Sequence, residues 1–311
     1  MGDAPIRLAA FNWLSARVAE HDDVLPWNIL RQGFDFKGES VSLVSVQGIF
    51  KPRTCELPIS IRTAVDGPYA DREGSDGRFF YKYRGTDPLH PENIGLRELM
   101  QRRIPLVYFL GLVPGRYLPA WPVFIIGDDP AKHTFTIQLD DTTSLAVGKR
   151  AMQGTSSDEH GQAERRRYVT RELRVRLHQR SFRERVLRAY KSQCALCRLR
   201  HHELLDAAHI IPDRDGGEPT VPNGLSLCKL HHAAFDKLFV GVRPDGIIEV
   251  RRDILEEHDG PMLLHGLKQL HQNRIHQPRP VAKRPDPDLL KVRYEHFSQA
   301  AGNATQLAAT R

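Results

Sequence analysis

Two short stretches near the middle of the chain decide the fold of its second half: CALC at residues 194–197 and CKLHH at residues 228–232. The first stretch offers two cysteines separated by two residues, and the second offers a cysteine and a histidine at the same spacing. Two such pairs are typical of a structural zinc site, which needs four soft or borderline ligands in a tetrahedron. We therefore predict a zinc site formed by Cys194, Cys197, Cys228 and His231.

Two adjacent histidines end the second stretch, although His231 alone completes the zinc site. They open the segment HHAAFDKLF, which we predict to be a helix, and neighbouring residues of a helix point about 100° apart around its axis. His232 therefore cannot reach the ion that His231 holds. Asp236 lies four residues further on, on the same helix face as His232. We expect these two side chains to approach a second ion together.

The residues between the two stretches have the pattern of a β-hairpin. LLDAAHIIPDRDGG (204–217) reads as a strand followed by a turn, and PNGLSL (222–227) reads as the returning strand. A hairpin followed by a helix around one metal ion is the ββα-metal architecture. With AAHIIP, NGL and the paired histidines in this order, the region resembles the HNH nuclease family.

This resemblance implies a role for each matching residue. His209 would be the general base, and Asn223 would hold the loop between the strands and orient that base. His232 would be a ligand of the catalytic metal, with Asp236 as a further ligand. The zinc ribbon that many family members carry around this core is matched by Cys194, Cys197, Cys228 and His231.

One position departs from the pattern of the family. Many members place an aspartate or a histidine directly before the general base as a metal ligand, whereas this chain has Ala208. Asp206 lies two residues earlier, on the same side of the strand, and is a candidate for that role. The alternative is a metal held by His232 and Asp236 with more water.

Phosphodiester hydrolysis accounts for these residue types. A histidine with an ordinary pKa can take a proton from water at neutral pH. A divalent cation stabilises the negative charge that develops on the phosphate and on the departing oxygen. We therefore predict two cofactors, a structural Zn²⁺ and a catalytic Mg²⁺ or Mn²⁺.

The composition limits the classes of protein to which the chain can belong. Its 311 residues are enough for two domains, and 40% of them are apolar. No apolar run approaches the roughly 18 residues of a membrane span, and the N-terminus lacks the pattern of a signal peptide. Three of the four cysteines fall in one cluster, which argues against a disulfide framework. We expect a cytoplasmic protein.

The charge of the chain favours a polyanionic partner. The formal net charge is +7 and the pI is near 9.3. Much of the excess lies in residues 165–200, where arginines and lysines are opposed only by Glu172 and Glu184. A segment this basic repels itself unless an anion lies nearby. The net charge alone fits a basic protein of any kind equally well. The prediction of a nucleic-acid partner therefore depends on the concentration of basic residues in 165–200.

The first half of the chain has the pattern of a β-rich domain. Helical patterns cover residues 8–31 and 96–103. About six short strands with few helices predict a closed or nearly closed β-barrel. The strand patterns cover residues 40–53, 57–65, 78–85, 105–126 and 133–139, and a Pro-Gly turn at 114–115 divides the fourth of these segments.

A polar, turn-rich stretch at residues 148–164 separates two predicted domains. Ser181 and Glu184 have the spacing of a capping box, which predicts that a helix starts there. The expected fold class is α+β, a barrel followed by a zinc-ribbon ββα-metal domain. The expected parts are a reader domain at 1–147, a linker and basic helix at 148–180, a nuclease domain at 181–300 and a disordered tail at 301–311.

The β-rich domain resembles the SRA-YDG family, whose members read modified bases. The matching segments are QGIF (47–50), YADREGSDGRFFYKYRG (69–85), and the paired strands PLVYF (105–109) and YLPAWPVFI (117–125). The resemblance implies a PUA-like barrel that extrudes a base from the duplex and holds it between aromatic rings.

The same resemblance implies three residues of a base pocket. Tyr69 and Tyr83 would stack on the extruded base, and Asp71 would accept a hydrogen bond from the amino group of cytosine. The chain departs from the family here, because Tyr69-Ala70-Asp71 stands in place of a contiguous Tyr-Asp-Gly string.

A reader barrel followed by a zinc-ribbon HNH domain is similar to the modification-dependent restriction endonucleases. This resemblance implies cleavage of double-stranded DNA that carries 5-methylcytosine or 5-hydroxymethylcytosine. Two alternatives stay open: a non-catalytic reader of modified DNA, and a nuclease whose barrel reads unmodified DNA or RNA.

We also expect a homodimer, because one HNH site has one base and one metal and cuts one strand. A two-fold dimer would present two sites to the antiparallel strands of the duplex. The candidate surfaces are the helices at 165–191 and the apolar stripe of Leu263, Leu267 and Leu270.

Overall fold

The computed structural model describes residues 2–63, 79–145, 177–258 and 260–309. The chain divides into two compact units, Met1–Arg180 and Ser181–Arg311, and each unit has its own hydrophobic core. Among the described residues, every helix is too short or too polar to span a lipid bilayer.

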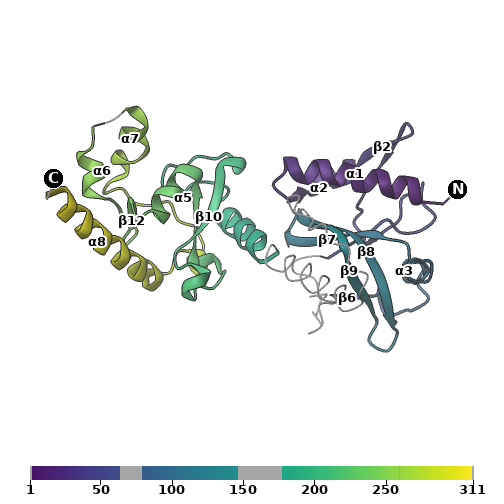
Figure 1. Ribbon diagram of the computed structural model, residues 1–311. Coiled ribbons are helices and arrows are strands. Elements are labelled where there is room, and N and C mark those ends of the chain that lie inside the picture. The colour runs from purple at the N-terminus through teal and green to yellow at the C-terminus, as the bar shows by residue number, and fades with distance from the viewer. Residues whose placement is uncertain (1, 64–78, 146–176, 259, 310–311) are drawn as a thin grey trace. The chain divides into compact units, whose positions relative to one another are not determined.

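The first unit is built on a curled sheet that contains seven strands in the described residues (Figure 1). The strands pair in the order β4-β5-β7-β8-β9-β6, and β1 pairs with β8. β5 and β7 are parallel, and the other neighbours are antiparallel. The elements of this unit are α1 (Ala4–Glu20), β1 (Leu25–Pro26), α2 (Trp27–Gln32), β2 (Phe34–Phe36), β3 (Glu39–Val41), β4 (Ile49–Phe50), β5 (Ser60–Arg62), β6 (Phe79–Lys82), α3 (Pro91–Arg102), β7 (Leu106–Val113), β8 (Arg116–Asp129) and β9 (Thr134–Leu145).

The helices and the long hairpin of this unit follow from the apolar pattern of the sequence. α1 contacts β8 through a buried stripe that recurs every fourth residue, as expected for a helix with one apolar face. β7 and β8 are joined at Pro114 and Gly115, and Gly115 has a φ of +81°, which glycine adopts without strain. The predicted Pro-Gly turn is therefore confirmed.

The segment 40–53, predicted as one strand, is wrong as a continuous element. It contains β3 and β4 with an irregular stretch between them. Ser42 Oγ donates to the carbonyl of Val44 at 2.8 Å, and Ser45 Oγ accepts from the backbone N–H of Gln47 at 3.2 Å. Local bonds of this kind compete with the ladder of a sheet, so the strand is interrupted here.

The ends of the sheet approach each other, but the described residues do not close it into a barrel. β4 and β6 stand at the two ends of the strand order, and no described pairing joins them. Tyr81 of β6 reaches across this seam, where its hydroxyl donates to the carbonyl of Arg62 in β5 at 3.4 Å. The seam is therefore bridged by a side chain rather than by a backbone ladder.

The second unit has the predicted hairpin and helix at its centre. β10 and β11 are antiparallel, with Asp206 opposite Leu227 and His209 opposite Gly224. α5 follows β11 directly, and α8 packs against β12. Besides a helix over residues 177–189, the elements of this unit are η1 (His202–Leu204), β10 (Leu205–His209), η2 (Asp213–Asp215), η3 (Val221–Asn223), β11 (Gly224–Cys228), α5 (Lys229–Asp236), β12 (Val240–Val242), β13 (Ile248–Val250), α6 (Arg252–Glu256), α7 (Pro261–Gly266), η4 (Lys268–Leu270), η5 (Val281–Lys283) and α8 (Pro287–Ala309).

Two expected helix boundaries in this unit are wrong. The helix predicted to start at Ser181 is continuous over residues 177–189, so Ser181 lies inside it and does not cap it. α8 continues to Ala309, so residues 301–309, expected as part of a disordered tail, are helical. Four alanines, a glutamine and a leucine favour a helix in that stretch, whereas Gly302, Asn303 and Thr305 have lower helix propensity.

The leucine stripe proposed as a dimer surface faces the core of its own unit. Leu267 and Leu270 are buried there, and Leu263 packs against the same core. The neighbouring Met262 and Leu264 are exposed instead. The apolar period of this segment therefore reflects intramolecular packing, and the prediction of a dimer surface on these three leucines is wrong.

Candidate active site and zinc centre

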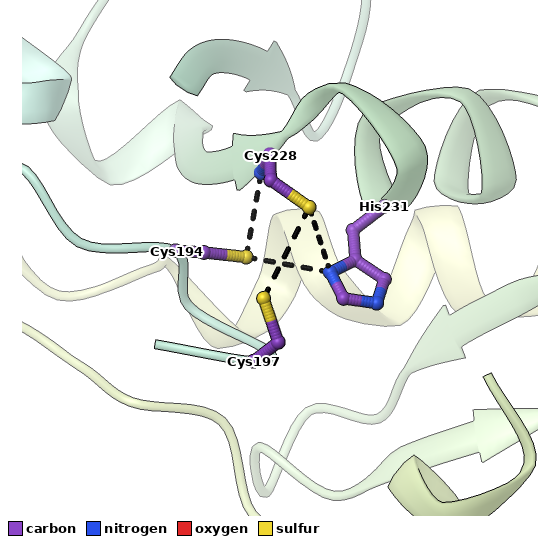
Figure 2. Close-up of side chains that lie close together, drawn as sticks. All are labelled: Cys194, Cys197, Cys228 and His231. Carbon is purple, nitrogen blue, oxygen red and sulfur yellow. Dashed lines mark hydrogen bonds between the residues drawn. The ribbon is translucent and has the colours of Figure 1, made fainter. Parts of the chain in front are cut away.

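Four side chains of the second unit lie close together in a cluster that could hold a metal ion (Figure 2). Cys194 and Cys197 lie in the turn after the 177–189 helix, Cys228 ends β11, and His231 lies in the first turn of α5. Their four ligand atoms all lie within 4.8 Å of one another.

The distances within this cluster fit zinc. A tetrahedral ion 2.3 Å from each sulfur would place two sulfurs roughly 3.8 Å apart. The Sγ atoms of Cys197 and Cys228 are 4.0 Å apart, and Nδ1 of His231 lies 3.5 Å from Sγ of Cys194 and 3.1 Å from Sγ of Cys228. The donor set of three sulfurs and one imidazole nitrogen is also one that structural zinc prefers.

The remaining nitrogen of His231 ties the cluster to another element. Nε2 lies 2.7 Å from the carbonyl of Gly266, at the end of α7, and can only donate to it. This bond places the hydrogen on Nε2 and leaves the lone pair of Nδ1 for a metal. The backbone N–H of Cys228 also donates to Sγ of Cys194, at 3.3 Å.

Asn223 holds the loop between the two hairpin strands. Its side chain is buried, and its Oδ1 accepts from the backbone N–H of Ile211 at 2.9 Å. Its Nδ2 donates to the carbonyls of Ile211 at 2.9 Å and Glu218 at 2.8 Å. These three bonds use both N–H donors of the side chain and one acceptor position of Oδ1, and none of them goes to His209.

Gly217 makes room for this clamp. A Cβ on Gly217 would lie 1.8 Å from the carbonyl oxygen of Ile211 and 2.8 Å from Nδ2 of Asn223. Only glycine fits at such a close approach of two backbone segments. The packing of the loop therefore explains Gly217, whereas Gly216 is explained by its φ of +84°, which glycine adopts without strain.

His209 stands at the end of β10 and is half-buried. Its Nε2 lies 3.2 Å from Oδ1 of Asp213, although the geometry of a hydrogen bond is not met, and Nε2 has no other partner among the described residues. Burial lowers the pKa of His209, and the opposing attraction of Asp213 and Asp236 does not offset it. The imidazole is therefore neutral near pH 7, as a general base must be.

His232 lies between two carboxylates on the solvent side of α5. Its Nδ1 is 3.3 Å from Oδ2 of Asp206, and its Nε2 is 3.4 Å from Oδ2 of Asp236. The structure thus brings together the three residues expected at the catalytic metal. Because the carboxylates face opposite nitrogens of one ring, a single ion can be shared by His232 and only one of them.

The two carboxylates differ in their surroundings. Asp206 lies 3.7 Å from Nζ of Lys229 and 3.5 Å from Nε of Arg183, and it accepts from the backbone N–H of Ala207. Burial raises the pKa of Asp206, but its hydrogen bond and charge pairing with His232, the backbone N–H of Ala207 and the charge of Lys229 outweigh burial and lower the pKa to about 2. The same bond raises the pKa of His232.

A further residue at this site comes from the C-terminal helix. Arg293 of α8 donates from NH2 to the carbonyl of Phe235 at 2.9 Å, and its guanidinium lies over the ring of Phe235 at 4.8 Å. The same nitrogen is 4.0 Å from Oδ1 of Asp236. Sequence reasoning missed this contact, because nothing in a tail helix shows which of its arginines faces the nuclease core.

A cavity of about 170 Å³ lies at the seam of the sheet in the first unit. It is lined by aromatic, basic and small residues from the two ends of the strand order. Of the three residues predicted for the base pocket, Tyr69 and Asp71 lie outside the described residues. The lining residues are Gly48, Ile49, Arg62, Thr63, Tyr81, Lys82, Tyr83 and Arg84.

Tyr83 lines this cavity, but its ring is engaged on the inner side of the sheet. The ring packs against Phe135 with a centroid distance of 4.7 Å, and its hydroxyl donates to Asp128. Arg97 donates to the same carboxylate at 2.6 Å. Tyr81 lines the cavity from the same face of β6, two residues away.

Comparison with known proteins identifies the central segment of the second unit. Residues 194–243 match the HNH_2 family, described as HNH endonuclease. No curated protein matches the chain. Among solved structures, the modification-dependent TagI restriction endonuclease is 15% identical, with 77% of this chain and 81% of that chain covered and a TM-score of 0.27.

A second solved structure is the type IV phosphorothioation-dependent restriction endonuclease ScoMcrA. It is 16% identical, with 56% of this chain and 52% of that chain covered and a TM-score of 0.19. The family match is the more specific finding, because its segment contains all four predicted zinc ligands together with the hairpin and helix of the candidate active site. The chain therefore contains an HNH endonuclease domain, and the protein is a DNA endonuclease.

Proposed function

We propose that the HNH site hydrolyses phosphodiester bonds with His209 as the general base. The observation that carries this proposal is the position of a neutral imidazole at the end of β10, within electrostatic reach of the His232–Asp236 pair of α5. The approach of Asp213 to Nε2 favours the tautomer with its hydrogen on that atom. Nδ1 then has the lone pair that takes the proton of the attacking water.

We assign the catalytic ion, Mg²⁺ or Mn²⁺, to Nε2 of His232 and the carboxylate of Asp236. Metal-binding histidines usually donate their other ring hydrogen to a carboxylate, and Asp206 is placed to accept that hydrogen from Nδ1. Asp206 has two cationic neighbours, Lys229 at 3.7 Å and Arg183 at 3.5 Å, whereas Asp236 has Arg293 at 4.0 Å, so a divalent cation would meet less repulsion at Asp236. A cation bound beside Asp236 would stabilise negative charge on the phosphate and on the departing oxygen.

The first unit is proposed to read modified cytosine and thereby to direct cleavage. Its cavity combines the phenol of Tyr81 and the edge of Tyr83 with the cations of Arg62, Lys82 and Arg84. Aromatic rings suit an extruded base, and cations suit the phosphates beside it. The cavity also lies on the segments that resemble the SRA-YDG readers, which makes 5-methylcytosine or 5-hydroxymethylcytosine the expected target.

Matched duplexes test both parts of the proposal. Cleavage by the full chain is measured on DNA with cytosine, 5-methylcytosine or 5-hydroxymethylcytosine, and binding is measured with the His209→Ala variant. We expect cleavage of modified DNA only, and a loss of rate in the variant of about 10²–10⁴-fold with binding retained. Equal cleavage of all duplexes would contradict the proposal that the first unit reads modified bases. Near wild-type cleavage by His209→Ala would contradict the proposal that His209 is the general base.

The proposed enzyme acts as a homodimer, since each site has one base and cuts one strand. Sedimentation of the full chain with and without a modified duplex tests this. The expected mass is twice that of the 35.4 kDa chain. A monomer that breaks both strands with a rate first-order in protein contradicts it.

A further inference from the structure

The orientation of His209 has no explanation in its hydrogen bonds. The family resemblance assigns Asn223 to orienting the base. The three hydrogen bonds of its side chain go to Ile211 and Glu218 instead. Nε2 of His209 is buried and makes no hydrogen bond of acceptable geometry. An imidazole on a single strand end would otherwise turn about its side-chain torsions, so another contact must hold it.

Phe182 makes that contact. Its ring is stacked on the imidazole of His209, with centroids 3.9 Å apart and an angle of 12° between the planes. Phe182 belongs to the 177–189 helix and is itself 2% exposed, so it cannot turn away without opening the core. The face-to-face contact of the two rings restricts the tilt of the imidazole. It leaves the two ring nitrogens, which lie at the edge of the imidazole, uncovered by the phenyl ring.

Gly224 lets the helix come close enough for this stack. It is the cross-strand partner of His209, and a Cβ built on it would lie 2.5 Å from Cγ2 of Val186 and 3.0 Å from Cζ of Phe182. Tyr190, one turn further along, directs its hydroxyl to the carbonyl of Gly224 at 3.4 Å. The helix is therefore seated on the hairpin by Val186 and Tyr190 as well as by Phe182.

We propose that Phe182 is the positioning residue for the general base, and that the 177–189 helix is thereby a functional part of the nuclease site. This inference rests on the proposed role of His209. The helix lies outside the segment that matches the HNH family, so the family match does not assign it a role. Phe182 touches the base and does not touch the reacting atoms.

The test compares Phe182→Leu with Val186→Ala in the full chain. Both changes remove apolar contact between the same helix and the same hairpin, but only the first removes the stack. We expect Phe182→Leu to lower kcat about 10- to 100-fold with KM for the modified duplex and zinc content unchanged, because a small displacement of a catalytic group has effects of this size. Val186→Ala should lose stability and keep kcat.

A pH profile separates positioning from general damage. The charged groups that influence His209 are Asp213, His232 and Asp236, and neither variant alters them. Burial lowers the pKa of the imidazole, so loss of the covering ring should move the acidic limb of kcat to higher pH. The acidic limb of kcat should have the same midpoint in Val186→Ala as in the wild type.

Wild-type protein with labelled histidine supplies a measurement that does not depend on a variant folding. The carbon-bound ring protons of His209, assigned with His209→Ala, should resonate upfield of those of exposed histidines because they lie over the ring of Phe182. His209 ring protons that resonate with those of exposed histidines would overturn the inference. A Phe182→Leu variant with the wild-type kcat and the wild-type acidic limb of kcat would also overturn it. Near wild-type cleavage by His209→Ala would instead show that the proposed function has failed.

Discussion

Asn223→Ala is the change whose cost can be worked most directly from the structure. Asn223 is 1% exposed and is the only side chain that bonds both ends of the described hairpin loop. Truncation to alanine leaves two backbone groups without their partners, the N–H and the carbonyl of Ile211, whereas the carbonyl of Glu218 keeps the bond from the backbone N–H of Thr220 at 2.8 Å. It also removes the atom against which Gly217 packs.

The magnitude depends on how far water can replace the lost partners. A fully buried group left without a hydrogen bond costs roughly 1–3 kcal/mol. Ile211 is half-buried and Glu218 is exposed, so water can reach part of the vacated site. We therefore expect a loss of about 2–4 kcal/mol in the free energy of unfolding, a large fraction of the ~5–15 kcal/mol that stabilises a typical domain.

Denaturant unfolding of the second unit, in the full chain with zinc in excess, measures this loss. Asn273→Ala is a matched control, because Nδ2 of Asn273 makes one exposed bond to the carbonyl of Gln269 at 2.7 Å. The control should lose about 0.5 kcal/mol. A loss of under 1 kcal/mol in Asn223→Ala, or equal losses in both variants, would refute the reasoning that this side chain clamps the loop.

Three further predictions concern metals and pH. Cys194→Ser should unfold the second unit and leave the first folded, because structural zinc supplies folding free energy to its own domain; stoichiometric zinc and a wild-type melting curve would contradict this. Chelation should stop cleavage, and added Mn²⁺ should restore it. Asp206→Asn should raise the Mn²⁺ concentration needed for cleavage about 10- to 100-fold, and Asp236→Asn should raise it more. The reverse order would make Asp206 the metal ligand and Asp236 the residue that orients His232. The acidic limb of the rate at saturating Mn²⁺ should have its midpoint below pH 6.5, because the pKa of His209 is lowered. At limiting Mn²⁺ the limb should move to higher pH, because the raised pKa of His232 makes protons compete with the metal; one midpoint at both concentrations would show that His232 is not a ligand.

The zinc cluster and the hairpin could be predicted from the sequence because their signals are local. Cys194 and Cys197 need only a short turn to bring their sulfurs together, and Cys228 and His231 need only the start of a helix. The strand that ends at His209 is bounded by turn residues on its far side. Ligand spacing and turn chemistry act over a few residues, so no knowledge of tertiary packing is required.

The contacts that complete the site could not be predicted, because they join segments far apart in the chain. Phe182 reads as an ordinary core position of a helix, and nothing in its spacing shows that the face it covers is that of His209. Arg293 reaches Asp236 from a helix at the other end of the unit. The stripe of Leu267 and Leu270 shows the opposite error, since an apolar period indicates burial and does not say whether the covering surface belongs to the same chain.

The two adjacent histidines suggest how a bound zinc ion that takes no part in the proposed chemistry would control it. His231 and His232 are consecutive residues of α5, and the first turns toward the sulfurs of the zinc cluster while the second turns toward Asp206 and Asp236. Cys228 is the last residue of β11, and its sulfur lies 3.1 Å from Nδ1 of His231 in α5, so the cluster joins α5 to β11. β11 is in turn paired with β10, the strand that ends in His209. Zinc bound by this cluster would set the position of His232 relative to His209, the proposed general base, through the first turn of α5 and the pairing of β10 with β11. We therefore expect loss of zinc to abolish cleavage by displacing His232, and we expect that Mn²⁺ will not restore the rate at any concentration until zinc is returned.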